Sequence, residues 1–357
     1  MYIVIAILAF GVIIAVHELG HYLSAKALKV KVYEFAIGMG PKILKKQGKE
    51  TLYSLRAFPL GGFCAMESPD EDPEDPRCFL SQKRWRRIII LSAGSAANLI
   101  AAFIIIVILT AGVDIFVGTT ITGLADGFPN RGSDGLLPGD RIVSINGDRL
   151  YYIDDFSLFM QLNAGSNVDL VIEREGNKIK LNDFPLERRV YNIDGTERLR
   201  YGLTFNVIEA TALEQFKYSC YQSYNFIRLI RVSLLMLASG DAGVNEISGF
   251  VGIVDAMNTI GKESPNTVTA IGNIAFFMAF IGVNVAVVNM LPIPAMDGGR
   301  ILFTFISWVI EKIIRRKLDP KYEGYINTGA FILLIGLMVF ILYNDIARII
   351  ASRIANG

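Results

Sequence analysis

The chain has 357 residues, of which 52% are hydrophobic and only 19% are charged, and its mean hydropathy is +0.42. A soluble globular protein carries about 25% charged residues, so this composition disfavours a soluble enzyme and favours a membrane protein with an inserted soluble part. The formal net charge of +1 argues against nucleic acid or another polyanion as a partner.

The first predicted element is an apolar helix over residues 1–28, long enough to cross a hydrocarbon core that takes about 20 residues. It lacks a basic start and a small-residue cleavage site. We therefore interpret it as a retained membrane helix and not as a signal peptide.

This helix contains both histidines of the chain, His17 and His21, in an HExxH pattern with Glu18. Residues i and i+4 share one helix face, so the two imidazoles can reach a single metal ion, and zinc suits such ligands. Glu18 is then close enough to take a proton from water at that metal. Because a carboxylate at the bilayer centre costs at least ~2.5 kcal/mol, polar residues there usually mark function.

Residues 29–87 form a basic loop that precedes a second predicted span at 88–113. Within the loop, residues 51–66 mix β-branched and aromatic side chains around Gly61 and Gly62, which predicts a membrane-associated β-hairpin. The acidic, proline-punctuated stretch 68–76 is predicted to be a solvated connector.

Residues 114–205 are predicted to be a small soluble domain of short strands. The strands are expected at 119–124 and 141–147 and in a hairpin over 168–181 that turns at Gly176 and Asn177. Between them, residues 154–163 fit an amphipathic helix with Asp154 or Asp155 as its N-cap.

Residues 206–270 are predicted to contain amphipathic helices at 213–237 and 244–260. Their regularly spaced charges favour helices that lie along the membrane interface. A true span at 213–237 is the alternative, and it would reverse the side on which the later loops lie.

The third predicted span, residues 271–310, is interrupted at Pro292 and Pro294, and the fourth covers residues 325–350. Prolines break a helix, and irregular backbone at membrane depth is tolerated only where it is buried in protein or lines a cavity. The break therefore predicts an internal polar site. Asp297 follows it and is our candidate for the third zinc ligand, whereas the alternative makes this residue only the N-cap of a helix resuming at Ile301.

The three cysteines, Cys64, Cys78 and Cys220, have the spacing of neither a metal site nor a disulfide framework. Lysine and arginine gather in the 29–87 loop and in the connection between the third and fourth spans. Four spans put these two segments on one side, which the positive-inside rule identifies as the cytoplasm. Both termini and the 114–205 domain are then predicted to lie outside.

The HELGH segment at 17–21, together with NMLPIPAMDGGR at 289–300, resembles the site-2 protease family of intramembrane zinc metalloproteases, in its bacterial RseP-like branch with a single PDZ domain. The resemblance extends over nearly the whole chain, through segments 35–43, 57–66, 75–86 and 248–253. Two positions depart from the family pattern: Met296 stands where leucine is usual, and Ser95 stands where proline is frequent.

The resemblance implies that His17, His21 and Asp297 bind zinc and that Glu18 is the catalytic base. It also implies that the 114–205 domain is PDZ-like and that the protein lies in the bacterial cytoplasmic (inner) membrane. Three residues are implied to hold the substrate, which is received as an added strand: Asn289, Gly61 and Gly62.

The expected function is therefore zinc-dependent cleavage of transmembrane segments of single-span proteins, such as trimmed anti-sigma factors or signal-peptide remnants, within the lipid bilayer and without nucleic acid. Two other classes were weighed. A membrane scaffold with a structural metal would not need the base Glu18. A metal transporter would need several polar stations along its spans, and the apolar segments supply few beyond this cluster.

Overall fold

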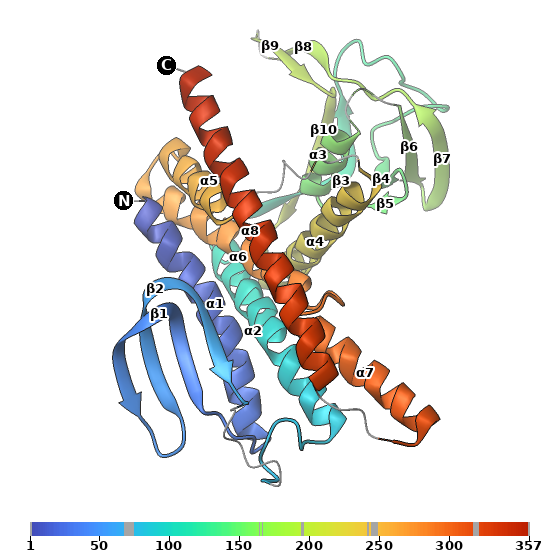
Figure 1. Cartoon of the computed structure of the whole chain (residues 1–357). Helices are drawn as coiled ribbons and strands as arrows, with labels where there is room; N and C mark the ends of the chain where they lie inside the picture. The colour runs from blue at the N-terminus through green and yellow to red at the C-terminus, as the bar shows by residue number, and fades with distance from the viewer. Residues whose placement is uncertain are drawn as a thin grey trace. The chain divides into compact units, whose positions relative to one another are not determined.

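The protein was analysed as a computed structural model that describes residues 2–67, 75–163, 165, 167–193, 196–240, 243, 249–316 and 321–355. The chain forms two compact units: the helical unit, residues 1–109 and 222–357, and the inserted unit, Thr110–Tyr221. In the described part, the helices long and apolar enough to cross a membrane are α1 (Tyr2–Ala27), α2 (Arg84–Thr110), α6 (Thr267–Asn289) and α8 (Lys321–Ala355) (Figure 1). This confirms the four apolar helices predicted from the sequence.

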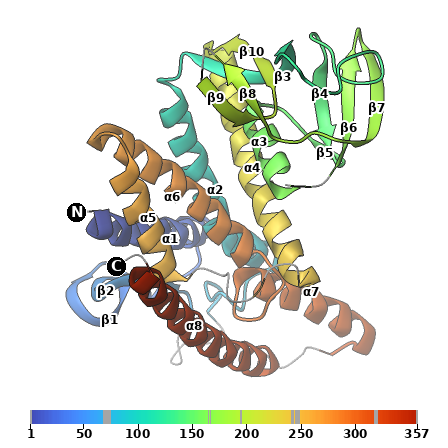
Figure 2. The same cartoon turned by 90° about the horizontal axis from the view of Figure 1, so that it is seen from above.

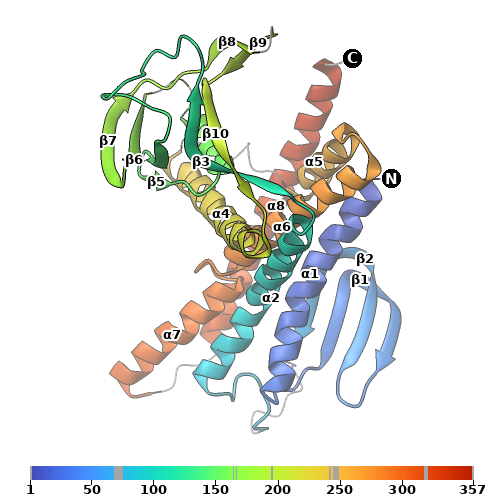
Figure 3. The same cartoon turned by 180° about the vertical axis from the view of Figure 1, so that it is seen from behind.

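Close packing joins α1 to α2, which lie side by side in Figures 1 and 3. A Cβ atom at Gly20 would lie 2.3 Å from the carbonyl oxygen of Ala93, so only glycine allows the two backbones to approach this closely. The approach places the face of α1 that carries both histidines against the middle of α2.

The predicted third span is two helices and not one. Helix α6 ends at Asn289, and a separate helix, α7 (Asp297–Ile314), begins after the Pro292–Pro294 break. Since α6 alone has 23 residues, it is long enough to span the membrane without α7. The span predicted over 271–310 with a proline break therefore consists of a spanning helix, the break and a second helix that starts at Asp297.

The predicted helices of the 206–270 region are α4 (Ala212–Ser239) and α5 (Phe250–Glu263), and residues 244–248 of the second prediction lie outside the described residues. Within the helical unit, α4 buries the polar side chains of Gln222, Asn225 and Arg228. These polar side chains of α4 thus face the protein. The regular spacing of charges had instead predicted that they face the membrane–water interface.

Helix α5 lies beside α1 and α6 (Figure 2), and its start is bound by a buried carboxylate of α8. Asp345 Oδ2 accepts hydrogen bonds from the backbone N–H groups of Gly249, at 3.0 Å, and Gly252, at 2.9 Å. These are donors that a helix start leaves without intrahelical partners. The apolar window of α8 is 0% buried, whereas the Asp345 side chain is fully buried. This carboxylate therefore attaches α8 to the start of α5.

The 29–87 loop contains a sheet formed by β1 (Glu34–Gln47) and β2 (Leu52–Ala65). Both strands are long and bent, so the first part of β1 lies between two parts of β2: Ala36 pairs with both Ser54 and Phe63. The second part of β1 pairs with the first part of β2, as Lys45 does with Ser54. Residues 62–65 thus form an outer segment of this sheet.

The hairpin predicted within residues 51–66 was therefore wrong in its turn and its partner. The turn lies between the two strands, where the Gly48 N–H donates to the carbonyl oxygen of Thr51 at 2.9 Å. Gly61 and Gly62 lie inside β2, and Gly61 has a φ of +89°. Glycines inside a strand allow the strand to bend and another part of the backbone to approach closely. Gly61 and Gly62 have this role here and do not form a turn. Of the acidic connector predicted at 68–76, residues 68–74 lie outside the described residues.

The inserted unit is a mainly antiparallel sheet with the helix α3 (Ile153–Leu162) and the start of α4. Its elements are β3 (Ile115–Leu124), β4 (Arg141–Ile145), β5 (Asp148–Arg149), α3 (Ile153–Leu162), β6 (Val168–Arg174), β7 (Asn177–Phe184), β8 (Arg189–Ile193), β9 (Thr196–Arg200) and β10 (Leu203–Glu209). The strand order is β10-β3-β4-β6-β7, with β5 paired to β4, and β8 and β9 form a separate pair. Ile121, Ile142, Leu170 and Phe156 pack in its core.

Two local predictions in this unit shift by a residue or more. The β6–β7 hairpin turns at Glu175 and Gly176, both with positive φ, and not at the predicted Gly176–Asn177. The N-cap of α3 is Tyr152, not Asp154 or Asp155, because Tyr152 has the extended backbone that a cap needs. Asp155 instead accepts from the Tyr151 N–H, at 2.6 Å, from inside the first turn.

Candidate metal centre and active site

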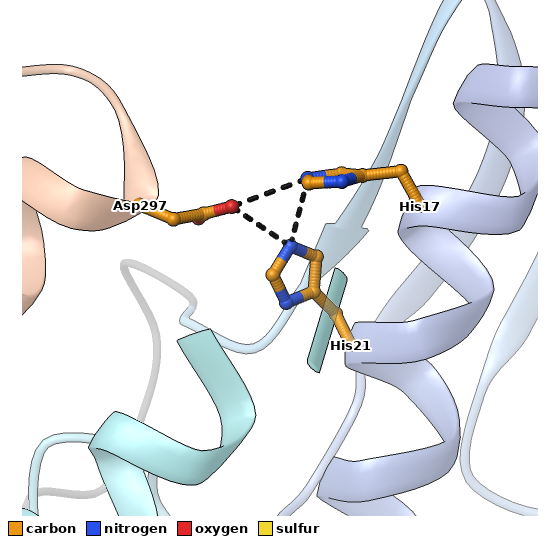
Figure 4. Close-up of side chains that lie close together, drawn as sticks. All are labelled: His17, His21 and Asp297. Atoms are coloured by element: carbon orange, nitrogen blue, oxygen red, sulfur yellow. Dashed lines mark hydrogen bonds and ion pairs between the residues drawn. The ribbon is translucent and has the colours of Figure 1, made fainter. Parts of the chain in front are cut away.

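Three side chains from α1 and α7 meet in one place (Figure 4). His17 Nε2 and His21 Nε2 lie 3.1 Å apart, and Asp297 Oδ2 lies 3.1 Å from the first and 3.2 Å from the second. The three atoms form a nearly equilateral triangle. We call these residues the zinc triad, after the metal that the sequence predicts for them. The structure thus brings together the two histidines of HExxH and the aspartate predicted 280 residues away.

The proline break fixes the position of Asp297. It is the first residue of α7, and Met296 is the N-cap, so the helix starts four residues before the Ile301 start that the capping alternative assumed. Gly298 and Gly299 hold this start against the break, because a Cβ atom there would lie 2.3 Å from the carbonyl oxygen of Met290 and 2.1 Å from that of Ile293. The carboxylate consequently points at the histidines.

The donor set fits zinc. With ligand distances near 2.0–2.1 Å, tetrahedral ligand atoms lie about 3.3 Å from one another, close to the observed 3.1–3.2 Å. His21 Nδ1 lies 2.8 Å from the carbonyl oxygen of Ile90 and can donate to it, which leaves the Nε2 lone pair free for a metal. Two imidazoles and one carboxylate leave a fourth tetrahedral position for water or substrate, as in catalytic zinc sites.

Gly94 of α2 closes one side of the triad, a role that the sequence patterns did not predict. A Cβ atom on this residue would lie 2.4 Å from His21 Nε2 and 2.8 Å from His17 Cε1. The residue after it, Ser95, which stands where the resemblance implies a frequent proline, is buried. A signal was present in the small-residue run at 93–97, which indicates close helix packing.

The site opens into a cavity of about 250 Å³, whose lining includes the zinc triad, Glu18 and Asn289. Asn289 Nδ2 lies 3.3 Å from His17 Nε2, so this predicted substrate residue borders the position of the metal. Glu18 lies beside the triad without belonging to it. A Cβ atom at Gly62 would be only 3.3 Å from Glu18 Cγ, so β2 passes directly over this carboxylate.

The outer segment of β2 forms one wall of this cavity. Phe63 and Cys64 line it, whereas the predicted substrate residues Gly61 and Gly62 stand just before them and set the path of the strand. Burial, with a further contribution from the nearby Glu18 charge, raises the pKa of the Cys64 thiol to about 12. A thiol with this pKa is neutral near pH 7.

A larger cavity, of about 560 Å³, adjoins the first and shares Cys64, Met66, Ala295 and Arg300 with it. Thr328 and Phe331 of α8 line its other side. Arg300 forms an ion pair with Glu67 at the boundary between the two cavities. Space for an extended peptide thus continues from the triad toward α8.

The chain is similar to known peptidases over nearly its whole length. The sequence pattern of peptidase family M50 matches residues 5–337. A protein of Clostridium acetobutylicum named as a zinc metalloprotease is 35% identical over 96% of this chain and 97% of its own length. One of Clostridium perfringens with the same description is 34% identical over 97% and 98%. The regulator of sigma-W protease RasP of Bacillus subtilis is 26% identical over 96% of this chain and 97% of its own.

Proposed function

Because this chain belongs to peptidase family M50, the site-2 proteases, we propose that it cuts the transmembrane segments of single-span proteins with the zinc triad and Glu18. The family and the relatives make it an integral membrane protein and a zinc-dependent hydrolase of peptide bonds. The observation that supports the proposed site most is the triangle of ligand atoms, which joins α1 to the break before α7 at zinc-like spacing.

Each residue has one role in this mechanism. Bound zinc supplies a Lewis acid that polarises the scissile carbonyl and acidifies water. His17, His21 and Asp297 hold the metal, and the Ile90 carbonyl fixes the tautomer of His21. Glu18 accepts the proton of the attacking water and returns it to the leaving amine.

The substrate must be extended where it is cut, because a helix hides its carbonyl groups in its own hydrogen bonds. We assign its binding to the outer edge of residues 62–65, which forms a wall of the cavity and offers backbone groups for an added strand. The Asn289 amide, beside His17 Nε2, is positioned to donate to the substrate backbone near the scissile bond.

The proposed substrates are trimmed single-span proteins, including anti-sigma factors and signal-peptide remnants. The name of the Bacillus subtilis relative, regulator of sigma-W protease, supports the first class. A scaffold with a structural metal would not require a carboxylate such as Glu18 beside the triad or a cavity there. A transporter would need further metal-binding groups, and the triad is the cluster of this kind found among the described residues.

For orientation, we propose that both termini and the inserted unit lie outside a bacterial cytoplasmic membrane, as the basic loops indicate. Single cysteines at Gly48 and Gly324, in a chain without the native three, should then be labelled only from the cytoplasm. One at Gly147 should be labelled from outside. Labelling of Gly324 from outside would mean that α4 crosses the membrane.

We further propose that the inserted unit is PDZ-like and acts as a size filter. An antiparallel sheet with the helix α3 between β5 and β6 supports this assignment. A substrate held in the membrane is already concentrated in two dimensions, so a weak additional contact would contribute little. Replacing residues 115–205 by a flexible linker should therefore allow cleavage of precursors that carry folded outer domains. Continued resistance of such precursors, with normal cleavage of trimmed substrates, would contradict the size filter and favour capture of a free C-terminus.

Incubation of the purified protein with a panel of single-span substrates, with and without a zinc chelator, tests the proposed function. Mass spectrometry of the products should locate cuts inside the hydrophobic segments, and chelation should abolish them. Cuts that persist after zinc is removed, or that fall only in soluble parts of the substrates, would refute the proposal.

A further inference from the structure

The inserted unit begins where a membrane span ends. Thr110 is the last residue of α2, and β3 starts five residues later at Ile115. Helix α4 returns to the same point, since Ser219 Oγ lies 2.9 Å from Thr110 Oγ1 and the Gln215 side chain donates to the Val113 carbonyl oxygen at 3.2 Å. The first two turns of α4 and the start of β3 therefore lie at the level of Thr110, the last residue of a helix that is long and apolar enough to cross a membrane.

Aromatic side chains gather at this level. Phe116 stacks on Tyr218 with ring centroids 4.3 Å apart, and Tyr151 stacks on Tyr221 at 4.2 Å. Tyr152 contacts both tyrosines of α4 edge-on, at 4.9 and 5.8 Å. We call these five side chains the aromatic collar. Tyrosine is enriched at the boundary between membrane and water because its ring is apolar and its hydroxyl is polar.

Large apolar side chains are exposed next to the aromatic collar. Ile115 of β3, Val207 of β10, and Leu213 and Phe216 of α4 are each more than half exposed within the unit. Such residues are unfavourable in water but suit the boundary between lipid headgroups and acyl chains. Phe116 and Tyr152 are buried within the collar, so its three partly exposed tyrosines and these apolar residues form the surface that suits lipid.

A cavity of about 270 Å³ opens beside the aromatic collar, and its lining is cationic. The charged residues that line it are Arg141, Arg149 and Lys217 against the single carboxylate of Glu214. Lys217 pairs with Glu214 at 2.5 Å, and the Arg149 guanidinium lies 5.2 Å from the centre of the Tyr151 ring. Three cations at one cavity favour a ligand that carries negative charge.

The existing ion pairs do not prevent such a ligand from binding. Arg141 pairs with Glu173, and its side chain is 51% exposed, while that of Lys217 is 47% exposed. Ion pairs this exposed contribute about 0–1 kcal/mol, so their cations can turn toward a ligand at small cost. Arginine in particular offers a planar array of donors that matches phosphate oxygens.

We propose that this cavity binds the phosphate of an anionic phospholipid headgroup and thereby fastens the base of the inserted unit to the membrane surface. The lipid, and not free phosphate, is the ligand because the aromatic collar and the exposed apolar residues match the rest of a lipid molecule. The three cations receive the headgroup, and the acyl chains lie along Leu213 and Phe216.

Native mass spectrometry of the full chain tests this site, with phosphatidylglycerol and phosphatidylcholine of identical acyl chains as probes. The unaltered protein should retain phosphatidylglycerol preferentially. The triple variant Arg141→Gln, Arg149→Gln, Lys217→Gln should bind it roughly 100-fold more weakly, with phosphatidylcholine binding unchanged, because each of the three cations contributes about 1 kcal/mol near an anionic membrane surface. The matched control removes three cations from β8 and β9 of the same unit, at Arg189, Arg198 and Arg200, and should behave like the unaltered protein.

Three results would overturn the proposal: no preference for phosphatidylglycerol, an equal loss in both triple variants, or displacement of the lipid by an excess of inorganic phosphate. The last result would identify a site for free phosphate. If the inserted unit of the triple variant does not fold, as judged by limited proteolysis, Arg149→Gln alone should weaken phosphatidylglycerol binding roughly fivefold. Unchanged binding in that variant would also count against the site.

Discussion

Replacement of Gly94 by alanine should weaken zinc binding although it leaves every proposed ligand in place. The new Cβ atom would lie 2.4 Å from His21 Nε2, which is 1.0 Å short of the 3.4 Å at which ordinary contact begins. It would also lie 2.8 Å from His17 Cε1. The added methyl group thus contacts both imidazole rings, and neither ring can avoid it by moving toward the other. The imidazoles must therefore leave the positions in which they form the triangle with Asp297.

The size of the effect follows from the cost of overpacking, about 1–3 kcal/mol. If the displaced rings lose that free energy from metal binding, the affinity for zinc falls by roughly 5- to 150-fold. Alanine is also favoured over glycine in a helix by about 1 kcal/mol. Thermal stability without metal should thus change little, whereas zinc affinity and cleavage should fall together.

Competition with a chromogenic chelator measures the affinity, and Gly272→Ala in α6 is the matched control. That glycine also lies in a spanning helix, but the nearest atom to its added Cβ would be Leu109 Cδ2 at 4.0 Å. The control should bind zinc normally. Normal zinc affinity in Gly94→Ala would refute the placement of α2 against the histidines.

Three further results are expected. Asp297→Ala should lower zinc stoichiometry well below one, and a value near one would show that the carboxylate is not a ligand. Asp345→Ala removes the acceptor of two buried N–H groups and should speed hydrogen exchange at the start of α5 by an amount equivalent to about 1–3 kcal/mol, with unchanged exchange as the contrary result. Burial raises the pKa of Glu34, but hydrogen bonds from Ser54, Arg56 and Lys42 lower it by more, so its folded pKa lies below the ordinary 4.5. The stability that ionised Glu34 contributes is present above pH 4.5 and is lost as the pH falls through its lowered pKa. Hydrogen exchange in the β1–β2 sheet should therefore rise at low pH, and Glu34→Gln should remove this pH dependence.

The sequence was most informative where a pattern is local. Length and hydropathy predicted the four apolar helices, and the spacing of His17 and His21 predicted their shared face. The proline break predicted a polar site, because irregular backbone at membrane depth is tolerated only where it is buried in protein or lines a cavity. Asp297 followed from the requirement for a third ligand, and the structure places it at that site.

Long-range features could not be predicted in this way. The pairing of β1 with β2 depends on bends in both strands, so Gly61 and Gly62 suggested a turn where they allow a close approach. The role of Gly94 arises only when α2 packs on α1, which no single helix pattern shows. Likewise, the polar side of α4 faces its neighbours in the helical unit, as buried Arg228 shows. The periodicity of a helix shows that it has a polar and an apolar face, but not which of the two faces packs against the protein.

The central claim is that the zinc triad holds the metal while Glu18 performs the proton transfer. It is tested most directly by measuring zinc content and cleavage of a single-span substrate together in Glu18→Gln, with His17→Ala as the comparison. We predict that Glu18→Gln retains one zinc and loses cleavage, because the amide is close in shape to the carboxylate but cannot accept the proton. His17→Ala should lose both zinc and cleavage. Full cleavage by Glu18→Gln would contradict the account.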